Sequence, residues 1–177
     1  MTDLKISVVI GVYNAEKFLR KAVSSAEELP EVEEIILIED CSTDDTYRVC
    51  QQLEKESAKV RLFQHPEKVN RGVAASKNFG VKKAKCELIA FLDADDYYLP
   101  NRFEAEKRLF PKNPKVDGVY GALGFHYYSD KLENKYKDHF FGELTTVTGN
   151  VPPDQLKYQL IGMCREDKGY FSLVTLT

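Results

Sequence analysis

Four hydrophobic runs alternate with amphipathic segments over the first hundred residues of this 177-residue chain. The runs are rich in Val, Ile, Leu and Phe, which is typical of strands that are buried on both faces. They occupy residues 6–11, 33–39, 59–65 and 87–93. Between the runs, apolar positions recur at helical spacing, first at Phe18, Leu19, Ala22, Val23 and Ala26. The pattern predicts the element order βαβαβαβ.

Strands that alternate with helices fold through right-handed crossovers into a mostly parallel sheet. We therefore predict an α/β protein, a three-layer α/β/α sandwich with helices on both faces of a central sheet. We expect Asn14 to be the N-cap of the first helix. Ser42, Thr43 or Asp44 can cap the second helix.

The pattern changes after Pro100. Residues 101–110 predict another helix, and residues 115–128 are strand-like but interrupted by glycines. A short helix is predicted to start at Pro152 or Pro153, and the chain stops within a strand-like segment, residues 169–177.

Composition narrows the class of protein. With 43% hydrophobic and 30% charged residues, the chain is typical of one globular domain. Its net charge of −3 gives no reason to expect a nucleic-acid partner. The sequence shows no signal peptide and no membrane span, so we expect a cytoplasmic location, including the inner face of the membrane. The four cysteines form no C-x-x-C pair, and the three histidines show no triad-like spacing, which leaves no predicted zinc site.

Polar motifs follow the first, second and fourth predicted strands. Because the carboxyl ends of parallel strands meet at one edge of a sheet, we expect these motifs to face a common cleft. In extended chain, Asp93 and Asp95 point the same way while Ala94 packs back. Two such carboxylates suit Mg²⁺ or Mn²⁺ that shares phosphate oxygens, and the alternative is a solvated acidic turn.

The second strand ends in Asp40, whose carboxylate could accept a hydrogen bond from a uracil imide or a ribose hydroxyl. Tyr13, just past the first strand, could lie against a base. Gly72 permits a tight turn or a positive φ before an alanine-rich helix. Lys77 and Asn78 lie on the first turns of that helix and point toward either the cleft or solvent.

Four stretches together resemble the successive motifs of the family 2 glycosyltransferases, which have the GT-A fold: VVIGVYN, LIEDCSTDDT, NRGVAASKNFGVKKA and ELIAFLDADDYYLPNR. The resemblance runs in the same order over about the first 110 residues. It implies transfer of a sugar from a nucleotide donor, commonly a UDP-sugar, with Mn²⁺ or Mg²⁺ bridging the diphosphate.

The resemblance also assigns site residues. It implies a base-contacting pair, Tyr13 and Asp40, and a metal site with Asp95 on the cation and Asp93 beside the ribose and donor sugar. The full implied nucleotide-sugar site is Gly11, Tyr13, Asp40, Gly72, Lys77, Asn78, Asp93 and Asp95. Cys41 stands where the family has glycine, a departure that affects the turn after the second strand.

The resemblance further implies one GT-A-like domain over residues 1–177, truncated at its C-terminus. Residues 1–110 would form the nucleotide-sugar-binding half, and residues 111–177 would begin the acceptor half. The acceptor would be a saccharide or a lipid-linked saccharide, and the catalytic base is expected beyond Thr177, since Glu166 and Asp167 precede the last strand-like segment.

Other classes of protein fit less well. A Rossmann dehydrogenase requires G-x-G-x-x-G after the first strand, and GVYNAE lacks it. A non-catalytic nucleotide-sugar-binding module or an inactive fragment shares every donor-side residue, so this alternative stays open.

Overall fold

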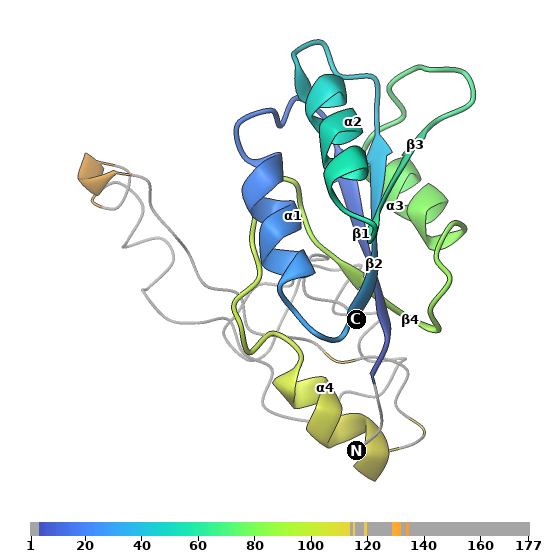
Figure 1. The fold of residues 1–177 in the computed structure, drawn as a ribbon, viewed down its shortest axis with the longest axis vertical. Helices are drawn as coiled ribbons and strands as arrows, with labels where there is room; N and C mark the ends of the chain where they lie inside the picture. Colours follow the sequence, from blue (N-terminus) through green and yellow to red (C-terminus); the bar gives the residue numbers. More distant parts are fainter. Residues whose placement is uncertain (1–3, 114, 116–118, 120–128, 132–133, 135–177) are drawn as a thin grey trace, which may run out of the picture. The chain divides into compact units, whose positions relative to one another are not determined.

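The computed structural model describes residues 4–113, 115, 119, 129–131 and 134 (Figure 1). The chain divides into two compact units, and the elements named here belong to the first, which extends to Val119. In chain order they are β1 (Ile6–Val12), α1 (Leu19–Glu27), β2 (Val32–Glu39), α2 (Thr46–Glu56), β3 (Val60–Gln64), α3 (Val73–Val81), β4 (Leu88–Phe91), α4 (Glu104–Leu109) and the 3₁₀ turn η1 (Phe110–Lys112). The predicted alternation of strands and helices is confirmed.

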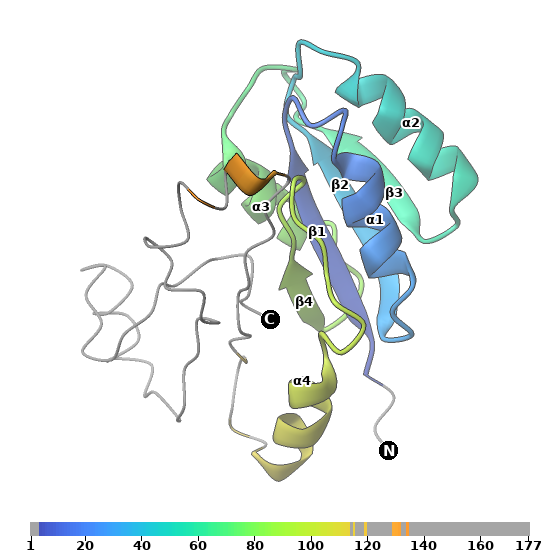
Figure 2. The same cartoon turned by 90° about the vertical axis from the view of Figure 1, so that its left-hand side faces the viewer.

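The four strands form one parallel sheet in the order β3-β2-β1-β4. β1 and β2 lie in the centre, which explains why their sequences are almost continuously apolar. As the chain moves outward from β1 to β3, right-handed crossovers place α1 and α2 on one face of the sheet. The return from β3 past β1 to β4 places α3 on the other face, as Figure 2 shows.

Close packing of α3 on the sheet depends on a glycine. A Cβ atom at Gly80 would lie 2.3 Å from a methyl carbon of Val9 in β1. Real Cβ atoms do not approach other carbons so closely, so the helix could not keep this position with alanine there. On the opposite face, α1 buries its predicted apolar positions Leu19, Ala22, Val23 and Ala26.

A buried carboxylate joins the strands at their amino ends. Glu34 of β2 accepts hydrogen bonds from the Ser7 hydroxyl at 2.7 Å, from the Lys85 backbone N–H at 2.6 Å and from Arg61 at 2.5 Å. Burial raises the pKa of Glu34, but the bonds from Ser7, Arg61 and Lys85 outweigh this effect and leave the pKa below its usual value. The network links β1, β2, β3 and the segment before β4.

Two predictions about helix starts are corrected. Asn14 is not the N-cap of α1, because the helix begins at Leu19, five residues later, and its N-cap is Phe18. The Asn14 side-chain oxygen instead accepts a hydrogen bond from the Thr43 backbone N–H at 2.8 Å, and the Asn14 N–H donates to the Ser42 hydroxyl at 3.1 Å. Of the three residues predicted to cap α2, Asp44 alone bonds near the helix start: its side chain accepts a hydrogen bond from the Thr46 backbone N–H at 3.0 Å. The loops after β1 and β2 are neighbours, so their polar groups bond to one another.

The predicted helix at 101–110 is present as the shorter α4. The strand-like segment predicted at 115–128 lies almost wholly outside the described residues, as do the helix near Pro152 and the segment 169–177. In the described part of the chain, no helix has both the length and the apolar character needed to cross a membrane.

Candidate functional site

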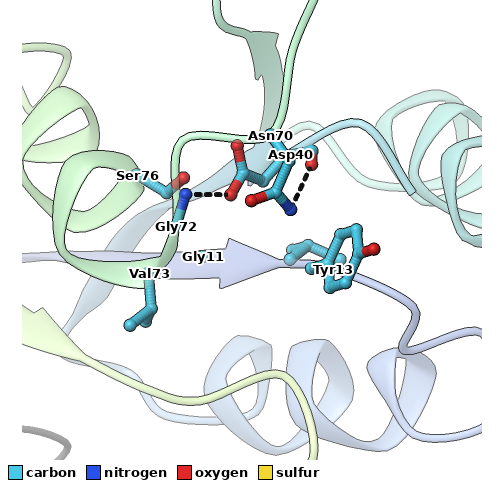
Figure 3. A pocket seen from close by; sticks show the side chains of 8 residues that line it. Gly11, Tyr13, Asp40, Asn70, Gly72, Val73 and Ser76 are labelled. Carbon is cyan, nitrogen blue, oxygen red and sulfur yellow. Dashed lines mark hydrogen bonds between the residues drawn. The ribbon is translucent and has the colours of Figure 1, made fainter.

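A pocket of about 220 Å³ lies at the carboxyl ends of β1 and β2, beside the first turns of α3 (Figure 3). It is lined by Gly11, Val12, Tyr13, Asp40, Asn70, Gly72, Val73 and Ser76. Four of the predicted site residues are therefore brought together: Gly11, Tyr13, Asp40 and Gly72. A cavity at this edge of a parallel sheet is where open α/β proteins bind ligands.

Asp40 fixes the loop that precedes α3. The residue is 3% exposed, and its two carboxylate oxygens accept backbone hydrogen bonds from Arg71 and Gly72, each at 2.8 Å. Its backbone carbonyl accepts a further bond from the Asn70 side chain at 3.1 Å (Figure 3). The sequence predicts a ligand-binding carboxylate here, and the structure adds an anchoring role that the sequence analysis missed.

Two glycines shape the pocket. Gly72 has φ = 84°, a left-handed conformation that strains any other residue, and this turn aims its N–H at Asp40. At the pocket floor, a Cβ on Gly11 would lie 3.5 Å from the Cβ of Ser76, in ordinary contact. Because α3 begins at Val73, the positive end of its helix dipole lies at the pocket, which favours an anionic group there.

Two apolar side chains of the pocket lining are exposed. Tyr13 is 49% exposed and Val73 is 59% exposed, and Figure 3 shows them well apart along the pocket. Tyr13 directly precedes Asn14, whose bonds to Ser42 and Thr43 hold the loop. A flat ring could therefore lie against Tyr13 without moving the loop.

The acidic segment after β4 is a turn and not the extended chain predicted for Asp93 to Asp95, because the Asp96 N–H donates to the Asp93 carbonyl at 3.1 Å. Leu92 and Ala94 are buried, Asp93 is partly exposed and Asp95 is exposed. Lys77, which is 8% exposed, reaches from α3 to Asp93, with its Nζ 2.7 Å from Oδ1. Of the two directions left open for Lys77, the structure thus shows the one toward the strand ends. Asn78 lies on the exposed surface of α3 and does not line the pocket.

The charge of this segment is only partly balanced. Burial, followed by the negative charges of Asp95 and Asp93, raises the pKa of Asp96 to about 6, against an opposing effect of Lys77. Within the described residues, no group of three His, Cys, Asp or Glu side chains is arranged to hold a metal. Asp93 and Asp95 can offer one or two carboxylates, which suits a divalent cation that takes its further oxygens from a phosphate.

Four pocket residues were not predicted from the sequence: Val12, Asn70, Val73 and Ser76. Asn70 and Val73 flank the Arg71-Gly72 turn, so the predicted turn at Gly72 was a usable signal for both. Ser76 lies one helical turn after Gly72 and donates its backbone N–H to the Gly72 carbonyl at 3.1 Å. Its position toward the pocket depends on the helix start, which the sequence does not fix to one residue.

The fold and the pocket define an α/β protein with its candidate site at the carboxyl edge of a parallel sheet. The model of the Glycosyl transferase family 2 matches residues 7–167, so the chain belongs to this family. An uncharacterised glycosyltransferase of Rickettsia conorii is 30% identical over 164 residues, which are 92% of this chain and 25% of that protein. The chain thus spans a quarter of the length of this curated relative.

Solved structures show the same fold. The crystal structure of Staphylococcus aureus TarS 1-349 in complex with UDP-GlcNAc matches with a TM-score of 0.59 at 23% identity, covering 71% of this chain and 36% of that chain. The mannosyltransferase PcManGT from Pyrobaculum calidifontis, in complex with GDP-Man and Mn²⁺, matches with a TM-score of 0.59 at 17% identity, covering 68% and 36%. The predicted GT-A fold is confirmed.

Proposed function

We propose that this chain contains the donor-binding part of an inverting glycosyltransferase that uses a UDP-sugar and a divalent metal. The observation that carries the proposal is the position of the pocket, at the ends of β1 and β2 and against the positive end of α3. The acceptor would be a hydroxyl of a saccharide or of a lipid-linked saccharide.

The pocket residues divide the work of holding a nucleotide. Tyr13 would lie against the base, and Asp40 would hold the Arg71-Gly72 turn in place while offering its remaining lone pairs to a base or ribose donor. The first turn of α3 would attract the diphosphate. The TarS structure with UDP-GlcNAc and the PcManGT structure with GDP-Man support a nucleotide-sugar as the ligand class.

The acidic segment after β4 would provide the metal site. Asp95 is exposed and available as a ligand, whereas Lys77 already neutralises part of the charge on Asp93. A bound Mn²⁺ or Mg²⁺ would stabilise negative charge on the leaving diphosphate. The Mn²⁺ in the PcManGT structure supports this role for a divalent cation.

Inverting transfer also needs a base that removes the proton of the acceptor hydroxyl. We assign no residue in the described part of the chain to this step. The donor-side residues therefore serve an active transferase and a non-catalytic nucleotide-sugar-binding module equally well.

Titration calorimetry with UDP, GDP and dTDP, each with Mn²⁺ and with EDTA, tests the proposal. We expect UDP to bind most tightly, and more tightly with Mn²⁺ than with EDTA. Binding of none of the three nucleotides would overturn the proposed site. If UDP binds but a UDP-sugar is neither transferred nor hydrolysed, the non-catalytic module becomes the better description of this chain.

A further inference from the structure

A buried histidine lies behind the pocket without lining it. His65 follows β3 and is 6% exposed, and its ring stacks on Phe79 of α3 with a centroid distance of 5.2 Å. Its Nε2 atom lies 3.1 Å from the Ser76 hydroxyl and 3.7 Å from Oδ1 of Asp40. His65 therefore contacts two residues of the pocket, one from α3 and one from the end of β2.

The two contacts favour a His65 imidazole that carries a proton on Nε2. A proton on Nε2 can donate to the Ser76 hydroxyl and at the same time face the carboxylate of Asp40, whereas a lone pair on Nε2 would face that negative charge. Both contacts are made by the same nitrogen. A nucleophilic triad places the carboxylate and the serine on opposite ring nitrogens, so this cluster is not one.

The contacts of His65 join the parts that form the pocket wall. Asp40 holds the N–H groups of Arg71 and Gly72, and Ser76 lies one turn into the helix that starts after Gly72. A side chain that bonds Ser76 and faces Asp40 therefore fixes the helix start relative to the strand end.

We propose that His65 is a positioning residue of the nucleotide pocket, acting through Ser76 and Asp40. The nucleotide arm of this inference rests on the proposed function, because it assumes that the pocket binds UDP. Nothing in the spacing of the histidines along the sequence points to this role.

Two substitutions separate the polar contact from ring packing. His65→Phe keeps a flat ring against Phe79 and removes the Nε2 contacts, whereas His65→Gln keeps an amide that can reach Ser76. We expect the Phe variant to weaken UDP binding by about tenfold and the Gln variant to retain most of the affinity. Ser7→Ala, which removes a buried hydrogen bond at the opposite end of β1, is the matched control and should leave UDP affinity unchanged.

Ser76→Ala breaks the same hydrogen bond from the other side and keeps the inference testable if the Phe variant fails to fold. If His65 acts through Ser76, the effects of His65→Phe and Ser76→Ala on UDP binding will be less than additive. Equal binding by the parent and the two single variants would overturn the inference. So would parent-like binding in His65→Phe with a loss in His65→Gln, since the ring would then act by packing alone.

A second readout does not depend on the nucleotide. Amide hydrogen exchange of Arg71 and Gly72 reports how firmly Asp40 holds the turn. We expect about tenfold faster exchange at these two amides in His65→Phe, with the rate restored in His65→Gln. If the parent binds no nucleotide, the proposed function fails, and this exchange measurement still decides the role of His65: unchanged rates overturn it.

Discussion

Asp40→Asn is the sharpest test of how the pocket is held together. Both oxygens of Asp40 accept backbone hydrogen bonds at 2.8 Å, and the residue is buried. An asparagine has one oxygen and one NH₂ group, so whichever way the amide turns, its NH₂ faces the N–H of either Arg71 or Gly72. The substitution keeps the size of the side chain but replaces one acceptor with a donor.

The expected cost follows from these two bonds. Loss of one charge-assisted hydrogen bond costs about 1.5–3 kcal/mol. This is a large part of the stability of an ordinary domain. For a chain of this length the lower figure corresponds to a fall in Tm of about 3–6 °C.

Thermal melting and UDP titration of the same variant separate two roles of Asp40. If the carboxylate anchors the turn, both Tm and UDP affinity fall. If it contacts the base alone, UDP affinity falls and Tm stays the same. Asp45→Asn is the control, because Asp45 is exposed and its contact with Arg48 is an exposed ion pair at 3.8 Å, so Tm should change little. A parent-like Tm for Asp40→Asn would refute the anchoring role.

Three further substitutions test other parts of the molecule. Gly80→Ala places a carbon 2.3 Å from a methyl of Val9, so we expect a loss of about 1–3 kcal/mol in chemical unfolding, and a stabilised variant would contradict the packing of α3. Asp95→Ala should remove the difference between UDP affinities measured with Mn²⁺ and with EDTA, and a persisting difference would place the metal elsewhere. Because the pKa of Glu34 is lowered in the folded state, its contribution to stability is complete above its unfolded-state pKa near 4.5. This contribution is lost as pH falls through its folded-state pKa. Tm measured from pH 7 to pH 3 should therefore fall less steeply in Glu34→Gln, which starts from a lower Tm; parallel curves would refute this.

The sequence predicts the elements well because the central strands β1 and β2 are buried on both faces. A continuous apolar run such as that of β2 is buried well by few structures other than a central strand. The amphipathic pattern between such runs limits those segments to helices in the same way. The strand order β3-β2-β1-β4 could not be predicted from the same pattern. It depends on which strands lie side by side once the crossovers have formed, and the hydrophobic runs do not encode that pairing. The directions of Asp93 and Asp95 could not be predicted from strand alternation, because β4 ends at Phe91 and the chain turns at these residues, with the Asp96 N–H bonded to the Asp93 carbonyl.

The site was less predictable wherever its bonds span long stretches of chain. Asp40 bonds to Arg71 and Gly72, about thirty residues away, and His65 lies near Asp40 only after the crossover from β2 through α2 to β3 has formed. The wrong assignment of Asn14 as a helix cap has the same cause. The side-chain oxygen of Asn14 could cap a helix, but it accepts a hydrogen bond from the Thr43 N–H of the neighbouring loop instead.

The two acidic strand ends differ in how their charge is satisfied, and this decides where a cation fits best. At the end of β2, Asp40 receives two backbone hydrogen bonds and lies near His65, so its charge is already stabilised by fixed protein groups. After β4, Lys77 pairs with Asp93 and counteracts the shift of Asp96, yet the pKa of Asp96 rises to about 6, first through burial and then through Asp95 and Asp93. A divalent cation would gain little at Asp40 but would relieve repulsion among the carboxylates after β4. The electrostatics therefore favour a metal at Asp95 and Asp93, and a fixed, metal-free pocket wall at Asp40.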